Sequence, residues 1–400
     1  MRIAILHNRY HYRGGEDNLV DFQVRLLTEA GHRVDTYIVN NDDVFRTGLS
    51  VKALAAAVAA SWNTRAYKRV KQLLCQCRPN VCHVHNWFPL LSPSVYAACR
   101  ELNVPVVQTL HNYRLLCANA TLFRDGEICE LCLDGELSHA LKYRCYRGSR
   151  LQTRVWRHVI ERNQARQVFQ QMVDRYIAPS QIVADKHMMA GLNPEKMIIL
   201  PHACDDPLAR LDTEAIINRD LHASDGAVYV GRLSPEKSLH TLIESWREID
   251  LPLKIIGDGP EEWRLHEMAA SQDKIEFLGR LEHDRVIDQI LGSAMLIFST
   301  GCYDTFGLGI VEAMACGRPV IAHQRGGPAE IIEHEKTGLL VSPGSPCAMR
   351  QAVLRLAGDP ALLNNCGQAA RRRYLEKYSP AAYLRSIEHL YSELAGLDQS

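Results

Sequence analysis

Two carboxylates lie close together in a glycine-rich stretch of this 400-residue chain. Seven residues separate Asp304 from Glu312 in GCYDTFGLGIVEAMACGRPVIAHQRGGPAE, and the pair Gly326-Gly327 follows. Such carboxylates suit general acid and base catalysis, metal binding, or acceptance of hydrogen bonds from paired hydroxyls. Metal binding is the least favoured of the three, because no histidine or further acid recurs at the spacing of metal ligands.

Glycines recur just past predicted strands, where they let the backbone approach a ligand. A helix that follows such a glycine presents N–H groups that bind phosphate. Any one of these loops also fits an ordinary tight turn, whereas four of them at equivalent positions indicate a phosphate-bearing ligand. The loops contain Gly14-Gly15, Gly231, Gly257 with Gly259, and Gly326-Gly327.

The loop GRLSPEK adds two cations to this pattern. Arg232 and Lys237 stand between a predicted strand and a predicted helix. There, arginine binds a diphosphate as a fork and lysine binds it as a point charge. The loop does not match GxxxxGK[ST], so it is not a P-loop. The alternative interpretation is a pair of solvated surface cations.

Short apolar runs alternate with helical patterns along most of the chain, which predicts parallel sheets with helices on both faces. The fold class is therefore α/β, with two Rossmann-like doubly wound domains and a ligand cleft at the carboxyl ends of the strands. The predicted strands lie near 2–8, 35–40, 80–86, 104–112 and 175–180, and then near 226–233, 251–259, 274–280, 295–300, 318–324 and 337–343.

The domain boundaries follow from these runs. The N-terminal domain is predicted over 1–200, with one long helix from Leu151 to about Val173. The C-terminal domain is predicted over 201–378, and a last helix over 379–400 could pack back on the N-terminal domain. In this arrangement Asp304 lies in a loop after a strand, and Glu312 lies about two turns into the next helix.

The motifs of the second half resemble those of the retaining GT-B glycosyltransferases of family 4. The family signature E-x-F-G-x4-E-A-M-A-x-G-x-P-V corresponds to DTFGLGIVEAMACGRPV, in which Asp304 replaces the first glutamate. GRLSPEK, GDGP, GGPAEII and TGLLV match further family motifs in the same order. The resemblance thus covers nearly all of the second domain.

The resemblance implies a role for each matching residue. Glu312 would bind the ribose of a nucleotide sugar, while Arg232 and Lys237 would bind its diphosphate. Asp304 would contact the donor sugar, although its carboxylate reaches one methylene less far than that of glutamate. The implied donor-binding residues are Gly14, Gly15, Arg232, Lys237, Gly257, Asp304, Phe306, Gly307 and Glu312.

The first domain carries weaker matches. The loop Gly14–Glu16 resembles the family's glycine loop beside the donor phosphates, and TLHNY resembles the segment whose histidine, His111, approaches the transferred sugar. Taken alone, His111 equally fits a capped surface histidine. His83 and His85 share one face of a predicted strand. They could be acceptor-side groups or a pair of metal ligands, but no third metal ligand is identified. His202 stands where the family commonly has asparagine.

The implied chemistry is transfer with retention of anomeric configuration and no enzyme nucleophile. The acceptor hydroxyl would attack the face from which the diphosphate leaves, and an oxygen of the leaving group would take its proton. Positioning and cations would then drive catalysis, with His111, Asp304, Arg232 and Lys237 at the reacting centre. No cofactor is expected for catalysis, because Arg and Lys supply the positive charge.

Four of the thirteen cysteines gather in an insertion over 117–145. Cys117, Cys129, Cys132 and Cys145 include one CxxC. A structural zinc ion bound by four thiolates would order this loop, and free thiols or a disulfide fit the spacing equally well. An odd number of cysteines argues against a complete disulfide framework.

The segment Lys142–Arg166 is strongly basic, with eight Lys or Arg and one acid. It suits either a solvated helix face or a surface that docks on anionic lipid or a lipid-linked acceptor. No nucleic-acid-binding motif accompanies it, so no nucleic acid is expected as a partner. No run of about 18 uncharged apolar residues is present. The expected location is therefore cytoplasmic, at the inner face of the membrane if this segment docks there.

These features predict a hexosyltransferase of surface polysaccharide biosynthesis. It would move a sugar from a UDP- or GDP-sugar to a glycan or lipid-linked saccharide. A sugar-nucleotide epimerase of the same build and a catalytically silent binding module are the alternatives. Replacement of Glu312 separates them, because a transferase would lose donor turnover whereas a binding module would keep its partner.

Overall fold

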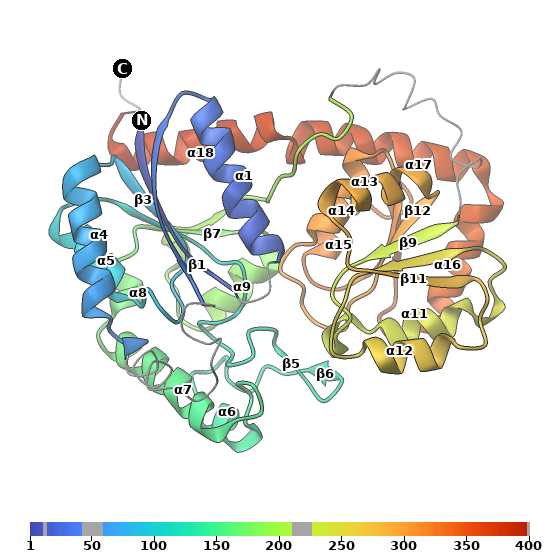
Figure 1. The fold of residues 1–400 in the computed structure, drawn as a ribbon, viewed down its shortest axis with the longest axis horizontal. Helices are drawn as coiled ribbons and strands as arrows, with labels where there is room; N and C mark the ends of the chain where they lie inside the picture. The colour runs from blue at the N-terminus through green and yellow to red at the C-terminus, as the bar shows by residue number, and fades with distance from the viewer. Residues whose placement is uncertain (11–13, 42–58, 210–225, 398–400) are drawn as a thin grey trace. The chain divides into compact units, whose positions relative to one another are not determined.

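The computed structural model describes residues 1–10, 14–41, 59–209 and 226–397 (Figure 1). These residues form two compact units. Unit 1 takes its residues from Met1–Ala120, Glu130–Leu200 and the chain from Leu384 onward, and unit 2 takes them from Thr121–Cys129 and Pro201–Tyr383.

Unit 1 is built on a six-stranded parallel sheet in the order β2-β1-β3-β4-β7-β8. Every residue of β3 is buried, as expected for a central strand that is covered on both faces. The order reverses between β1 and β3, so a ligand crevice is expected at their carboxyl ends. The strands are β1 (Arg2–Arg9), β2 (Arg33–Asn40), β3 (Val81–Asn86), β4 (Val106–Thr109), β7 (Arg175–Ala178) and β8 (Met197–Ile199).

Helices cover both faces of this sheet, with α1 on one side and α4 and α5 on the other (Figure 1). The Asn63 side chain accepts hydrogen bonds from the amides of Arg65 and Ala66, which fixes the start of α4. The helices of unit 1 are α1 (Gly15–Glu29), α4 (Thr64–Cys77), α5 (Ser94–Glu101), α6 (Ser138–Tyr143), α7 (Arg150–Ala165), α8 (Val168–Gln171), α9 (Gln181–Met189) and a 3-10 turn (Pro194–Lys196).

The prediction of one helix from Leu151 to about Val173 is wrong. Helix α7 ends at Ala165, and α8 begins at Val168. Gln167 between them has a φ of 52°, in the left-handed region that ends a helix. No glycine or proline marks this break in the sequence, so the helical spacing of the apolar residues predicted one continuous helix. Part of the helix predicted over 53–77 lies outside the described residues.

Unit 2 holds a second six-stranded parallel sheet, in the order β11-β10-β9-β12-β13-β14. Its strand order reverses between β9 and β12, which places a second crevice at their carboxyl ends. The strands are β9 (Ala227–Val230), β10 (Leu253–Ile256), β11 (Ile275–Gly279), β12 (Met295–Phe298), β13 (Val320–His323) and β14 (Gly338–Val341).

Alternate residues of these strands enter two separate cores, one on each face of the sheet. Tyr229 and Ile297 pack under α11, α12 and α16, whereas Val228 and Leu296 pack under α13, α14 and α17 (Figure 1). The helices of unit 2 are α11 (Leu239–Ser245), α12 (Glu262–Ala269), α13 (His283–Gly292), α14 (Leu308–Ala315), α15 (Pro328–Ile331), α16 (Pro346–Gly358) and α17 (Pro360–Arg373), with short turns at Pro235–Lys237, Trp246–Glu248 and Tyr374–Tyr378. The last helix, α18 (Pro380–Ala395), begins in unit 2, and its residues from Leu384 onward belong to unit 1. The predicted fold class, two parallel α/β units of Rossmann type, is confirmed.

The cysteine-bearing insertion contains a small hairpin. Strand β5 (Phe123–Arg124) pairs antiparallel with β6 (Glu127–Ile128). Residues Thr121–Cys129, which include the hairpin, group with unit 2. The other parts of the insertion belong to unit 1.

Candidate functional site

Lys237 and Asp304 form an ion pair at the crevice of unit 2. Lys237 ends the turn after β9, and Asp304 lies in the loop after β12. The Nζ atom of Lys237 lies 2.7 and 2.9 Å from the two Asp304 carboxylate oxygens. Burial alone would lower the pKa of Lys237, but the charge of Asp304 outweighs it and holds that pKa above its usual value. Lys237 therefore stays positively charged, and both carboxylate oxygens of Asp304 accept hydrogen bonds from it.

The glycine pair behind this loop fixes the position of Asp304. A Cβ atom on Gly326 would lie 2.7 Å from the Asp304 carbonyl oxygen, and one on Gly327 would lie 2.8 Å from the Cα of Phe306. The Gly327 amide also donates to the Asp304 carbonyl at 2.8 Å. These glycines therefore allow two loops to pack backbone to backbone.

Gly257 has the same kind of structural requirement. Its φ is 141°, and a Cβ atom there would lie 1.9 Å from the carbonyl oxygen of Gly231. The end of β10 can therefore lie against the end of β9 only if residue 257 is glycine. Arg232, the next residue after Gly231, is exposed.

Glu312 is a second acid of unit 2, in a different setting. It lies in the second turn of α14, with 16% of its side chain exposed. Burial raises its pKa, while His283, whose Nδ1 lies 3.8 Å from Oε1, acts in the opposite direction. Gly307 begins α14 with a φ of 122°, and the Phe306 ring is buried against His202 and Tyr378. Phe306 therefore offers a ligand its backbone only.

In unit 1, the Gly14-Gly15 pair lies at the start of α1. Gly14 is the N-cap residue, and within the described part of the chain no atom lies within 4 Å of a Cβ placed on it. The first turn also holds Glu16 and Asp17, whose charges would repel a phosphate. Burial and the neighbouring Asp17 raise the pKa of Glu16 to about 8, so Glu16 is largely uncharged near neutral pH.

Four histidines gather at the carboxyl ends of the central strands of unit 1. His85 Nδ1 lies 2.9 Å from His111 Nε2, and the His83 and His85 rings stack with their centroids 4.1 Å apart. His7 completes the cluster and lies 2.8 Å from Asp17. The HxH spacing in β3 indicated part of this cluster. His7 and Asp17 were missed, although His7 is the next-to-last residue of the strand predicted over 2–8, ahead of the glycine loop.

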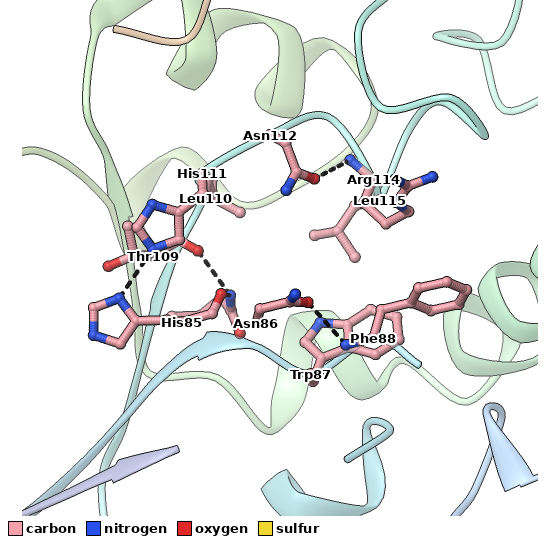
Figure 2. A pocket seen from close by; sticks show the side chains of 11 residues that line it. His85, Asn86, Trp87, Phe88, Thr109, Leu110, His111, Asn112, Arg114 and Leu115 are labelled. Carbon is pink, nitrogen blue, oxygen red and sulfur yellow. Dashed lines mark hydrogen bonds between the residues drawn. The ribbon is translucent and has the colours of Figure 1, made fainter. Parts of the chain in front are cut away.

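His111 lines a small pocket of about 30 Å³, room for a water molecule or two (Figure 2). The wall combines side chains from the ends of β3 and β4 and the residues after them. Asn112 donates to the Tyr10 hydroxyl at 3.1 Å and to Glu16 at 3.4 Å. The pocket is lined by His85, Asn86, Trp87, Phe88, Gln108, Thr109, Leu110, His111, Asn112, Arg114 and Leu115.

The predicted zinc site is not assembled in this structure. All thirteen cysteines fall in the described ranges, and none is in a disulfide. Across those ranges, no three His, Cys, Asp or Glu side chains are grouped to hold a metal ion. Cys117 Sγ instead donates to Asn119 Oδ1 at 2.7 Å. Zinc at Cys117, Cys129, Cys132 and Cys145 stays a prediction.

The basic segment Lys142–Arg166 spans α6 and α7. Trp156 is fully buried and its indole N–H donates to the Arg114 carbonyl, so this aromatic residue belongs to the core. Most of the basic side chains are exposed, and so is Leu151, at 65%. Within the residues described here, no helix is both long and apolar enough to cross a membrane.

Two protein families match the two halves of the chain. The family described as Glycosyltransferase Family 4 matches residues 13–206, and the family described as Glycosyl transferases group 1 matches residues 222–373. Together these matches include most of the sequence, with Glu16, Asp17, His83, His85 and His111 in the first and Arg232, Lys237, Asp304 and Glu312 in the second, whereas His7 lies before the first match.

The chain is also similar to individual glycosyltransferases, in sequence and in structure. The chain is 29% identical over 218 residues to the alpha-D-kanosaminyltransferase of Streptomyces kanamyceticus (51% of this chain, 56% of that one). It is 33% identical over 162 residues to the GDP-mannose-dependent alpha-mannosyltransferase of Mycolicibacterium smegmatis (40% and 41%). The matches span about half the length of the curated relatives. Among solved structures, HepE of Anabaena in complex with UDP superposes with a TM-score of 0.66 at 18% identity, covering 98% of this chain and 100% of that one.

Proposed function

Because the chain belongs to the GT-B glycosyltransferases of group 1 and family 4, we propose that it transfers a sugar from a nucleotide-sugar donor with retention of configuration. The acceptor is a glycan or a lipid-linked saccharide, in the synthesis of a surface polysaccharide. The observation that most favours this proposal is the partly buried Lys237, whose pKa is held above its usual value, at the strand-order reversal of unit 2. A diphosphate leaving group needs a cation there.

The donor binds along unit 2 in this proposal. Lys237 and the exposed Arg232 neutralise the diphosphate, and the amide groups at the start of α14 lie beside the donor sugar. Glu312 accepts hydrogen bonds from the ribose hydroxyls, since its carboxylate retains unused acceptor capacity beside His283. HepE was crystallised with UDP and with UDP-glucose, so UDP-sugars are the first donors to test.

Unit 1 contributes the glycine loop and His111. The backbone of Gly14-Gly15 approaches the donor phosphates, with open space beside Gly14, and the largely uncharged Glu16 reduces the repulsion. His111 contacts the transferred sugar. The pocket beside it begins the acceptor site.

The transfer needs no enzyme nucleophile. A new bond forms between the acceptor oxygen and the anomeric carbon on the face from which the bond to the diphosphate breaks. The acceptor proton passes to the departing phosphate oxygen, so atoms and charge balance. Lys237 and Arg232 stabilise the negative charge that develops on the leaving group, and we propose that this replaces a divalent ion in catalysis.

We also propose that the basic segment Lys142–Arg166 contacts anionic lipid or a lipid-pyrophosphate acceptor at the cytoplasmic face of a membrane. Exposed cations beside the exposed Leu151 suit such a surface. Co-sedimentation with vesicles that contain anionic lipid tests this. We expect the wild type to bind anionic vesicles and not neutral ones. The double variant Arg150→Glu and Arg154→Glu should bind the anionic vesicles more weakly.

A thermal-shift screen against UDP-, GDP- and ADP-sugars tests the donor proposal. A ligand that binds only the folded chain raises its melting temperature. At least one donor should do so, and the shift should disappear in Glu312→Gln. A panel in which no donor shifts the melting temperature and none is hydrolysed would contradict the proposed function.

A further inference from the structure

The buried histidine next to His111 has no assigned role. We propose that His85 is a positioning residue for the sugar transfer, which holds the His111 ring in place and sets which His111 nitrogen carries the proton. This inference rests on the proposed function, because it concerns how His111 meets the donor sugar. His85, His111 and the residues that hold them all belong to unit 1.

The contact between the two rings restricts their protons. His85 Nδ1 lies 2.9 Å from His111 Nε2, and the rings are inclined by 21° (Figure 2). Two imidazole nitrogens at this distance share one proton, so one ring donates and the other accepts. The tautomer of His111 is therefore tied to the tautomer of His85.

His83 gives His85 a rigid support. The Tyr391 hydroxyl lies 2.6 Å from His83 Nδ1, and the Gln23 amide nitrogen lies 3.0 Å from the same atom. The Gln23 amide also donates to the Tyr391 hydroxyl at 2.8 Å, so the hydroxyl proton is directed to His83. His83 Nδ1 thus accepts and Nε2 carries the ring proton, 2.6 Å from Thr109 Oγ1.

The fixed His83 ring then limits how His85 can move. The two rings stack with an interplanar angle of 23°. The Gln108 side chain donates to the carbonyls of both His85 and Thr109, which ties the ends of β3 and β4 together. Further titratable groups lie near His83 and His85. The His7 ring is edge-on to His85 with the centroids 6.2 Å apart and contacts Asp17, and the Tyr391 hydroxyl contacts His83.

Exposure separates the roles of the two bonded histidines. His85 is 3% exposed, whereas His111 is partly exposed where it lines the pocket. A ligand can therefore meet His111 directly but feels His85 only through it. This is the arrangement in which a buried partner orients a functional imidazole and fixes its tautomer.

Three substitutions at one position test this inference. His85→Asn keeps a polar group near the place of Nδ1, His85→Gln moves that group toward the place of Nε2, and His85→Phe keeps the ring without hydrogen bonds. The main measurement is the ¹⁵N NMR signal of the His111 ring in histidine-labelled protein, assigned by its loss in His111→Asn. We expect one His111 tautomer in the wild type and in His85→Asn, and a mixture in His85→Phe and His85→Gln.

Kinetics with UDP-glucose or whichever donor the thermal screen identifies give the second measurement. His85→Phe should lower kcat about tenfold, the effect of one hydrogen bond, with little change in KM, and His85→Asn should restore most of it. Unchanged His111 ring signals in His85→Phe, or identical behaviour of the Asn and Gln variants, would overturn the inference. If the wild type turns over no donor, the proposed function fails, and the NMR result alone decides the role of His85.

Discussion

Unit 2 holds an ion pair at its strand-order reversal, whereas unit 1 holds hydrogen-bonded histidines at its own. Lys237 and Asp304 are each about one-fifth exposed, and Lys237 keeps its charge. His83 and His85 are almost completely buried, and each nitrogen contact among them needs a defined tautomer. The proposed function accounts for this difference, since a diphosphate needs countercharge and a sugar needs oriented hydrogen bonds.

The largest effect should follow from removing the cation of unit 2. Lys237→Met should lower kcat by about a thousandfold, the scale found when one group that stabilises developing negative charge is lost. Lys336→Met is the matched control, because that lysine is 75% exposed. Donor turnover measured by release of the nucleoside diphosphate checks this. Equal activity of Lys237→Met and Lys336→Met would show that the charge of Lys237 is not needed for transfer.

Glu312→Gln tests the second acid of unit 2. We expect the dissociation constant for the free nucleoside diphosphate to rise about thirtyfold, because hydrogen bonds to a charged acceptor are worth more than neutral ones. Isothermal titration calorimetry measures this directly. Glu276→Gln, an exposed change in β11, should leave the affinity unchanged. If both variants bind equally well, the ribose is bound elsewhere.

Asp304→Asn sharpens the comparison by leaving Lys237 without its charged partner. We expect kcat to fall about tenfold and the free energy of unfolding to fall by about 2 kcal/mol at neutral pH. The folded-state pKa of Lys237 is raised, so the pair stabilises the fold below the ordinary lysine pKa and loses that effect as the pH rises through the folded-state pKa.

Urea titrations at pH 7 measure that stability difference. Asp250→Asn is the control, since Asp250 is 91% exposed and pairs with Lys274 on the surface. If Asp304→Glu is more active than the wild type, the shorter reach of aspartate toward the donor sugar limits the activity. If Asp304→Glu is less active, holding Lys237 is the more important role.

The smallest effect concerns Glu16 in unit 1. Its folded-state pKa is raised to about 8, so the carboxyl destabilises the fold progressively as the pH rises from its ordinary value through 8. Glu16→Gln should therefore raise the melting temperature at pH 9 and change it little at pH 4. Calorimetry checks this, with Glu29→Gln on the same helix as the control. A shift of equal size at both pH values would show that Glu16 is not buried in its protonated form.

The sequence was most informative where function depends on residue type and motif order. It placed Arg232, Lys237 and Asp304 in loops after strands and Glu312 in the helix that follows, because motif and alternation are local. It could not show that Lys237 bonds Asp304, since 67 residues separate them and only the adjacency of β9 and β12 brings them together. For Gly257 it suggested a nearby ligand, which stays a prediction, and it gave no sign of the close approach to Gly231.

Unit 1 was harder to predict for the same physical reason. The hydrogen bond between His83 and Tyr391 joins residues 308 positions apart, and no spacing rule reports it. The break between α7 and α8 was missed because Gln167 adopts a left-handed conformation without a glycine or proline signal. The four cysteines have metal-like spacing, but spacing does not determine whether their side chains converge.

The most direct test of the central claim is the release of nucleoside diphosphate from a panel of UDP-, GDP- and ADP-sugars, followed by ³¹P NMR. The wild type and Lys237→Met should be compared at equal concentration, after circular dichroism has shown that both are folded. We predict that the wild type releases diphosphate from at least one donor and that Lys237→Met releases almost none. Equal release by both proteins, or no release by the wild type from any donor, would contradict the account.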